Sequence, residues 1–265
     1  MHDKGPLLGR QVAGSATYDP GLLFPVPRAN ARQSLGDGFG GRGEDVWHAY
    51  ELSWLDASGM PRARTGTITV PATSPNLIES KSLKLYLNSL NNHAFGDDEE
   101  ARGTIAADLS EVAQGDVTLE LQSATGEGLG SPELPGQCLD GLSVAVPASP
   151  DGGSLEPQSG DDCVHTHLLR SLCPVTAQPD WATVIVDCRG HHAPREALLA
   201  YLLAYRNHQE FHEQCVERIF ADLWQRLQPT FLSVQALYTR RGGLDICPWR
   251  CSEAGPAPAW RLPRQ

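Results

Sequence analysis

Residues 78–89 read Ile-Glu-Ser-Lys-Ser-Leu-Lys-Leu-Tyr-Leu-Asn-Ser, and this stretch says most about the expected fold. Apolar residues recur along it at steps of three and four: Leu83, Tyr86, Leu87 and Leu90. Such spacing predicts a helix with one face packed into a core. Asn76 followed by Glu79 fits a capping box, which would place Glu79 in the first helical turn. Taken alone, the stretch predicts a capped surface helix with charged residues at its start.

Around this helix, the same order of predicted elements occurs twice. In the first half, the patterns predict two strands, two helices and two strands at 45–55, 65–70, 78–90, 97–114, 117–121 and 142–146. In the second half, the corresponding patterns lie at 164–169, 181–188, 194–205, 211–227 and 231–239. Paired helices over antiparallel sheets indicate an α+β protein.

The segments outside these patterns set the expected domain boundaries. Residues 1–45 are rich in Gly, Pro and Arg without a sustained period, so we expect an N-terminal arm. Residues 148–162 are rich in Pro, Gly, Ser and Asp, which predicts a linker between units at 46–147 and 163–251. The tail at 252–265 is expected to be poorly ordered.

Composition narrows the class of protein. The formal net charge of −11 argues against a nucleic-acid surface, because phosphate binding relies on Lys and Arg. The longest apolar run, 197–205, is about half of a membrane span, and no secretory segment is recognisable near the start. Seven cysteines without regular spacing favour reduced thiols. We therefore expect a soluble, cytoplasmic protein that binds neither nucleic acid nor membrane.

Five further stretches share with residues 78–89 a resemblance to one family: 18–28, 50–55, 173–181, 211–220 and 238–249. Together they resemble the long, two-module form of the QueF family, NADPH-dependent nitrile reductases that convert 7-cyano-7-deazaguanine to its aminomethyl product in queuosine biosynthesis, a tRNA modification pathway. The resemblance implies two tandem tunnelling-fold units of ββααββ order, and a homodimer or larger assembly.

Cys173 and Asp180 are the expected catalytic pair. Pro174 and Pro179 exclude a continuous helix here and predict a loop that enters the strand at Trp181. From the residues alone, a small buried cysteine and a Pro-Asp turn are the usual explanation of such a loop. The resemblance implies instead that Cys173 is the nucleophile and Asp180 the general acid. A thiolate converts a nitrile into a thioimidate that accepts hydride more readily, and the nitrogen then needs a proton donor.

The expected substrate contacts come from both halves of the chain. His212 stands four and seven residues before Val216 and Ile219 and shares their inward face, so a core histidine beside a solvated glutamate is the ordinary interpretation. The resemblance implies that the substrate is bound by Ile78, Glu79, Ser80, His212 and Glu213. Carboxylates suit the N–H and amine edge of a purine-like base.

The expected reductant site also draws on both halves. A basic turn, Arg-Arg-Gly-Gly at 240–243, could be no more than a hairpin connection with glycines at positive φ. Arginine also offers paired donors to phosphate. The resemblance implies that NADPH is bound by Ser80, Lys81, Arg241 and Gly242. It further implies two NADPH per turnover and no required metal.

Three other patterns resemble binding sites but lack the context that such sites need. The Gly-rich run at 36–41 matches a dinucleotide fingerprint but follows no predicted strand and opens no helix. Cys163, His165 and His167 alternate along a predicted strand, but their spacing fits no common zinc signature. A similarly weak pair follows near the end: Cys247 and Cys251. We therefore expect no metal centre.

Two other functions stay open from the residues. One is a zinc-dependent purine or pterin hydrolase of the GTP cyclohydrolase type, which would need converging Cys and His ligands and no reductant. The other is a non-catalytic purine-binding module. The presence of every expected catalytic and substrate residue argues against the second.

Overall fold

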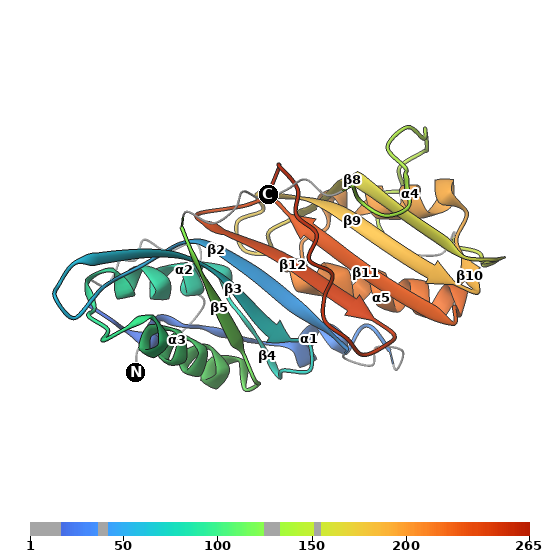
Figure 1. Cartoon of the computed structure of the whole chain (residues 1–265). Coiled ribbons are helices and arrows are strands. Elements are labelled where there is room, and N and C mark those ends of the chain that lie inside the picture. Colours follow the sequence, from blue (N-terminus) through green and yellow to red (C-terminus); the bar gives the residue numbers. More distant parts are fainter. Residues whose placement is uncertain (1–16, 37–41, 125–132, 151–154) are drawn as a thin grey trace. The chain divides into compact units, whose positions relative to one another are not determined.

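The computed structural model describes residues 17–36, 42–124, 133–150 and 155–265 (Figure 1). The chain divides into two compact units that are not continuous in sequence. The first comprises Met1–Ala29, Val46–Gly128 and Arg240–Asp245, and the second comprises Asn30–Asp45, Leu129–Thr239 and Ile246–Gln265. Each unit was expected to be one continuous stretch of sequence. Both units instead combine separate stretches, because segments far apart in the chain pack together.

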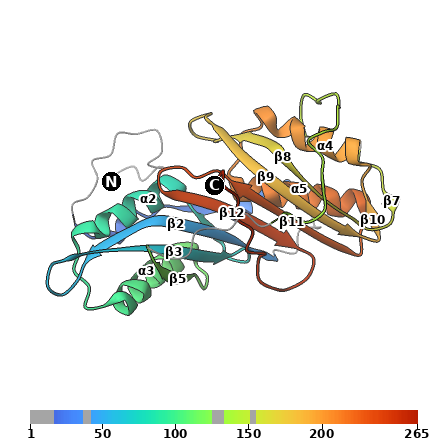
Figure 2. The same ribbon diagram turned by 45° about the horizontal axis from the view of Figure 1, so that its top comes forward.

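The first unit places helices beside an antiparallel sheet, as Figure 2 shows. Its elements include a short 3-10 helix, η1 (Pro20–Leu22), strands β1 (Pro25–Pro27), β2 (Gly43–Leu55), β3 (Pro61–Pro71), β4 (Asn76–Ile78) and β5 (Thr118–Ser123), helices α2 (Ser80–Ser89), η2 (Leu90–Asn92) and α3 (Asp98–Ala113), and the start of α1 (Arg28–Arg32). The sheet order is β5-β3-β2, and β1 pairs with β4 in a separate ladder. The predicted apolar face of α2 is confirmed: Leu83, Tyr86, Leu87 and Leu90 are all buried.

The second unit has the complete predicted order. Its elements are β6 (Gln137–Cys138), β7 (Gln158–Ser159), β8 (Asp162–Leu172), β9 (Pro179–Arg189), β10 (His191–His192), α4 (Arg195–Leu203), η3 (Ala204–Asn207), α5 (His212–Leu227), β11 (Phe231–Tyr238) and β12 (Leu244–Cys251). The sheet order is β12-β11-β9-β8-β6, antiparallel except for the β6–β8 pair. The α+β class is confirmed.

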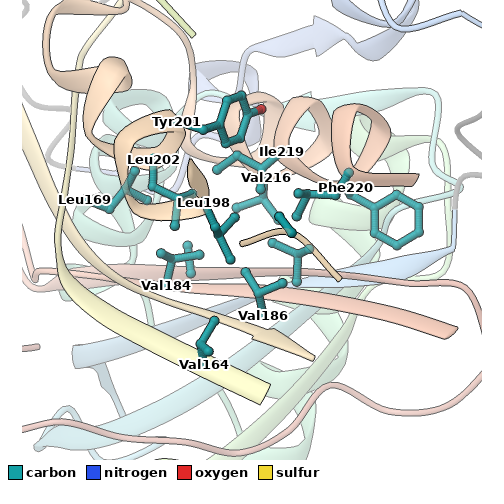
Figure 3. Packing of buried hydrophobic residues seen from close by; sticks show 14 of the residues in the cluster. Val164, Leu169, Val184, Val186, Leu198, Tyr201, Leu202, Val216, Ile219 and Phe220 are labelled. Atoms are coloured by element: carbon teal, nitrogen blue, oxygen red, sulfur yellow. The ribbon is translucent and has the colours of Figure 1, made fainter. Parts of the chain in front are cut away.

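The core of the second unit lies between these strands and helices α4 and α5 (Figure 3). Val164, Val184 and Val186 point from the strands toward Leu198 on α4 and Val216 on α5. Each such buried aliphatic side chain contributes about 1.5–3 kcal/mol of transfer free energy. This packing fixes the start of α5, which carries two of the expected site residues.

The predicted strand at 142–146 is wrong. These residues form no ladder, and Val146 is 52% exposed. Leu142 and Val144 instead pack against the core of the second unit, so their alternation reflects half-burial without strand pairing. Among its described residues the first unit therefore has one strand after its helices, β5, where two were expected.

The described parts of the predicted arm and linker contain paired strands, and the tail is more ordered than expected. Within the arm, η1 and β1 precede α1, and β1 pairs with β4. In the predicted linker, Leu155 is buried in the core and β7 pairs with β10. The tail is held by side-chain bonds: Gln235 Nε2 donates to Pro258 O at 2.8 Å, and Gln265 Nε2 lies 3.0 Å from Cys247 Sγ. The sequences of these segments show no regular apolar spacing, because each segment is held by contacts with residues elsewhere in the chain.

The predicted alternation of Tyr50, Leu52 and Trp54 holds only in part. Leu52 and Trp54 are buried, but upstream the buried residues are Trp47 and Ala49, so the phase changes near Tyr50. Tyr50 is half-buried, and its hydroxyl donates to Asp245 Oδ2 at 2.5 Å.

Two expectations on composition can be compared with the structure. All seven cysteines lie in the described ranges and are free thiols. Within those ranges, no helix combines the length and apolar character needed to cross a membrane. The glycine run at 36–41 lies almost wholly outside the described residues.

Candidate active site

Cys173 and Asp180 lie on the same face of one β-hairpin. Strands β8 and β9 pair Ser171 with Asp180, and the Cys173 N–H extends this pairing by donating to Gln178 O at 2.9 Å. Opposed residues of an antiparallel pair point to the same side, and the side alternates along each strand. Cys173 is therefore a diagonal neighbour of Asp180, a separation that typically spans about 7–8 Å between Cα atoms. Both are only 3% exposed.

The turn between them is a loop, as the two prolines predicted. Residues 174–176 form the turn, and Ala177 takes a left-handed conformation with φ of 54°. The Ala177 N–H donates to Cys173 O at 3.0 Å, which closes the turn directly behind the thiol. The cysteine is thus held by backbone bonds on a rigid hairpin.

Other cysteines of the second unit are poorly suited to nucleophilic attack. Burial raises the pKa of Cys188 to about 12 and also raises that of Cys163 and Cys215. A thiol with a raised pKa stays neutral near pH 7, and the thiolate is the attacking form.

His212 lies beside Asp180, the expected general acid. It is the first residue of α5, and its Nε2 lies 3.0 Å from Asp180 Oδ2. Its ring stacks on Tyr238, with ring centroids 3.9 Å apart and planes inclined by 17°. Burial raises the pKa of Tyr238 well above its ordinary value, so the phenol stays protonated. The stacking fixes the imidazole orientation and holds Nε2 close to the Asp180 carboxylate, in a contact that lacks hydrogen-bond geometry.

Glu213 is 3% exposed, so the alternative of a solvated glutamate is wrong. The predicted inward face of α5 is confirmed, because His212, Val216 and Ile219 are all buried. A carboxylate at such a site must be compensated by hydrogen bonds or charge. The helix start therefore presents an imidazole and a carboxylate from adjacent positions.

Sequence reasoning missed the ion-pair cluster of His208, Glu210 and Arg218, which anchors the entry to α5. His208 Nε2 lies 2.9 Å from Glu210 Oε2, and Arg218 Nε donates to both oxygens of Glu210. Burial alone would raise the pKa of Glu210, but the bonds from His208 and Arg218 outweigh it and hold the pKa below its usual value. The same loop bonds to Leu172 in both directions, beside Cys173. An eight-residue separation offers no helical pattern that would reveal this cluster.

In the first unit, Glu79 itself caps α2, which corrects the predicted capping box. Its Oε1 accepts from Lys81 N at 2.9 Å and its Oε2 from Ser82 N at 2.8 Å. Asn76 lies in β4, and its side chain donates instead to Val112 O. The chain reaches this position extended, because β1 and β4 pair Pro25 with Ile78. Glu79 therefore has the extended backbone of an N-cap residue, directly before the first turn of α2.

The turn at 240–243 lies close to α2 within the first unit. Arg241 and Leu244 exchange backbone bonds of 2.8 and 3.2 Å, and Gly242 and Gly243 have φ of 61° and 85°. These values match a type I′ hairpin turn. A Cβ on Gly242 would lie 2.7 Å from Lys84 Nζ, the mobile end of that side chain, and the positive φ of Gly242 itself favours glycine here.

Lys84 was missed as a candidate although it belongs to the opening stretch. It lies three residues after Lys81, so the two ammonium groups follow one side of α2. The signal was present in the Lys-Ser-Leu-Lys spacing. Its link to Gly242 depends on the strand turn, which sequence does not show.

The expected site residues divide between the units. The second unit holds Cys173, Asp180, His212 and Glu213, and the structure gathers them at the β8–β9 hairpin and the start of α5. The first unit holds Ile78, Glu79, Ser80, Lys81, Arg241 and Gly242, at the start of α2 and the neighbouring turn.

Comparison with known proteins gives a consistent result. A family model described as a nitrile reductase, 7-cyano-7-deazaguanine-reductase N-term, matches residues 15–121, and one described as a QueF-like protein matches 179–256. The NADPH-dependent 7-cyano-7-deazaguanine reductase of Stenotrophomonas maltophilia (strain K279a) is 49% identical over 270 residues, covering 97% of each chain. Proteins of the same name from Chromohalobacter salexigens and Acinetobacter baylyi are 48% and 46% identical, covering 97% and 98% of this chain and 96% and 98% of theirs. This chain therefore belongs to the NADPH-dependent 7-cyano-7-deazaguanine reductase family.

Proposed function

We propose that this protein reduces the nitrile of 7-cyano-7-deazaguanine to the aminomethyl group with NADPH, in the biosynthesis of queuosine. The observation that carries the proposal is the shared face of Cys173 and Asp180 on one hairpin, with His212 beside the aspartate. A thiol and a carboxyl group on one face of a hairpin are suited to act as nucleophile and proton donor toward the carbon and nitrogen of one nitrile.

The Cys173 thiolate adds to the nitrile carbon, forming a C–S bond while one C≡N π bond breaks. The electron pair moves to the nitrogen, which takes a proton from Asp180, so the product is a neutral thioimidate. His212 holds the reactive oxygen of Asp180 in place and can return a proton to it. The low exposure of both reacting groups limits hydrolysis of the thioimidate by water.

The same nitrogen must gain further protons before the amine is complete. Hydride from bound NADPH would add to the thioimidate carbon and give a tetrahedral adduct, whose C–S bond then breaks, so that the Cys173 thiolate is regenerated and an imine remains. Asp180, replenished through His212, is the proposed source of protons for that nitrogen. Cys173 is therefore bound covalently to the substrate during the first reduction and is free again during the second.

Recognition of the base is assigned to both units. Glu79 and Glu213 are proposed to accept bonds from the N–H and amine edge, with Ile78, Ser80 and His212 completing the contacts. Two carboxylates at helix starts suit such an edge, because a charged acceptor strengthens each hydrogen bond.

The reductant is proposed to be NADPH, bound through Ser80, Lys81, Arg241 and Gly242, with Lys84 as an additional cation. Support comes from the close approach of Gly242 to Lys84, since backbone without a Cβ beside cations suits a phosphate. When bound, the nicotinamide supplies hydride to the substrate carbon. Four electrons are needed from nitrile to amine, so two NADPH are expected per product, and no metal is required.

The test is stoichiometry in chelator-treated enzyme. We expect two NADPH oxidised per amine formed, slow reaction with NADH, and no activity in Cys173→Ala. Cys163→Ser is a matched control, because Cys163 lies on β8, the strand that leads into the Cys173 loop, and has no proposed role in the reaction. One NADPH per product, or activity lost on chelation, would contradict the proposal. Turnover of a purine or pterin without oxidation of NADPH would favour the zinc-dependent hydrolase instead.

We also infer a homodimer or larger assembly acting on the free base, as the family resemblance implies. Light scattering of the purified protein measures this directly. A monomer at the concentrations of the activity assay would contradict it.

A further inference from the structure

Three ligand-type side chains converge on the outer part of the sheet of the second unit. Cys138 on β6, together with His165 and His167 on β8, place one ligating atom each within 4.8 Å of the others. Strand pairing explains the convergence: β6 runs parallel to β8 and sets Cys138 directly beside His165. The two histidine rings have centroids 5.5 Å apart. Sequence spacing had grouped Cys163 with these histidines, but the strand register replaces it with Cys138.

The hydrogen bonds of both rings select the nitrogen that can bind an ion. His165 Nδ1 lies 3.0 Å from the Pro135 carbonyl oxygen, and His167 Nδ1 lies 2.9 Å from Thr183 Oγ1. A carbonyl can only accept, so His165 Nδ1 donates and its lone pair lies on Nε2, and the Thr183 hydroxyl can accept from His167 Nδ1 in the same way. Metal-binding histidines typically have such an oxygen partner on the other nitrogen.

A second set of bonds fixes the backbone around His167. The β8–β9 register is interrupted between Thr166 and Leu169, which displaces His167 from regular pairing. Asp140 stabilises this irregularity, because its Oδ1 accepts from Thr166 Oγ1 at 2.6 Å and from His167 N at 3.0 Å. Asp140 follows Cys138 by two residues, so one short segment both supplies a thiol and positions a histidine.

The three side chains line a pocket of about 600 Å³ that offers room for a fourth ligand. Glu133 also lines it and could supply a carboxylate, while water fits equally well. Arg264 also lines the pocket, and its positive charge would repel a metal ion. Its Nη1 donates to His167 O at 2.9 Å, which directs part of the guanidinium toward the backbone.

We propose that Cys138, His165 and His167 form a zinc-binding site that is separate from the reduction chemistry. One thiolate and two imidazoles are a donor set that zinc prefers, with bonds of about 2.3 Å to sulfur and about 2.0–2.1 Å to nitrogen. Tetrahedral ligands at these distances lie about 3.3–3.7 Å apart, so small side-chain rotations close the present separations. Bound zinc would join the segment carrying Cys138 to strand β8.

The experiment compares metal binding by full-length protein and single variants after chelator treatment and dialysis against zinc chloride. We expect about one zinc per chain in the wild type and in Cys163→Ser, and a loss of at least tenfold in affinity in Cys138→Ser and His167→Gln, because loss of even an outer-shell partner of a ligand typically costs about 10- to 100-fold. Cys163→Ser is the matched control because Cys163 lies two residues before His165 and outside the cluster.

Cobalt provides a second readout that does not depend on activity or on stability. Cobalt bound at this site should give a thiolate charge-transfer band and intense tetrahedral bands, both absent in Cys138→Ser. Circular dichroism shows whether each variant is folded. The proposal is overturned if the wild type binds no zinc, or if folded Cys138→Ser keeps the thiolate band or the wild-type affinity.

Discussion

Glu79 combines two roles that substitutions can separate. Its carboxylate caps α2 by accepting from the backbone of Lys81 and Ser82, and it is proposed to accept from the substrate as well. Glu79→Gln keeps one acceptor oxygen and turns an amide NH2 toward the other N–H. Glu79→Asp keeps the charge and a favourable N-cap type but withdraws the carboxylate by one methylene, about 1.5 Å.

The structure gives magnitudes for each substitution. Loss of an N-cap costs about 0.5–2 kcal/mol, and the buried position of Glu79 puts Glu79→Gln toward the upper end. Glu79→Asp should leave stability within about 0.5 kcal/mol of the wild type, because Asp is itself a strong N-cap. Both variants should weaken substrate binding by about 10- to 100-fold, since a hydrogen bond to a charged group contributes about 1.5–3 kcal/mol.

Thermal unfolding measures the first effect and calorimetric titration with 7-cyano-7-deazaguanine the second. We expect Glu79→Gln to be impaired in both and Glu79→Asp in binding alone. Wild-type affinity in Glu79→Asp would refute the substrate role and leave Glu79 as a cap only. Equal destabilisation of both variants would refute the reasoning on capping.

Three further predictions concern the reaction, the reductant and pH. Asp180→Asn should lower kcat by about 100-fold or more, as expected for a lost general acid, and should slow formation of the covalent adduct followed by intact mass; an unchanged kcat would contradict the assignment. Arg241→Ala should raise KM for NADPH far more than for NADH, and equal changes would place the 2′-phosphate elsewhere. Because the pKa of Glu210 is held below its usual value of 4.5, its contribution to stability is present above that pH and is lost as pH falls through the lowered pKa. Glu210→Gln should therefore lower the melting temperature at pH 7 but much less at pH 3, and an equal loss at both would contradict the ion-pair account.

The sequence predicted best those helices whose apolar residues recur at a regular spacing. The apolar face of α2 and the inward face of α5 both follow from local spacing, and both are buried. The strand expected at 142–146 failed because alternation reports half-burial, and Leu142 and Val144 achieve this by packing without pairing. Local pattern cannot distinguish the two.

What sequence missed depends on contacts between distant residues. Gly242 lies close to the Lys84 side chain because a hairpin turn brings residues 240–243 beside α2. Cys138 lies next to His165 because β6 pairs with β8 in parallel. The Glu210–Arg218 anchor likewise joins a loop to a helix. The roles of Cys173 and Asp180 came from family resemblance, and the hairpin register adds a shared face that loop composition alone does not give.

The central claim is a covalent bond between Cys173 and the nitrile carbon. Intact mass spectrometry of full-length protein mixed with 7-cyano-7-deazaguanine, without NADPH, tests it most directly. The account predicts an added mass of one substrate in the wild type and in Cys163→Ser, and no added mass in Cys173→Ala. An adduct of equal size and yield in Cys173→Ala, or none in the wild type, would contradict it.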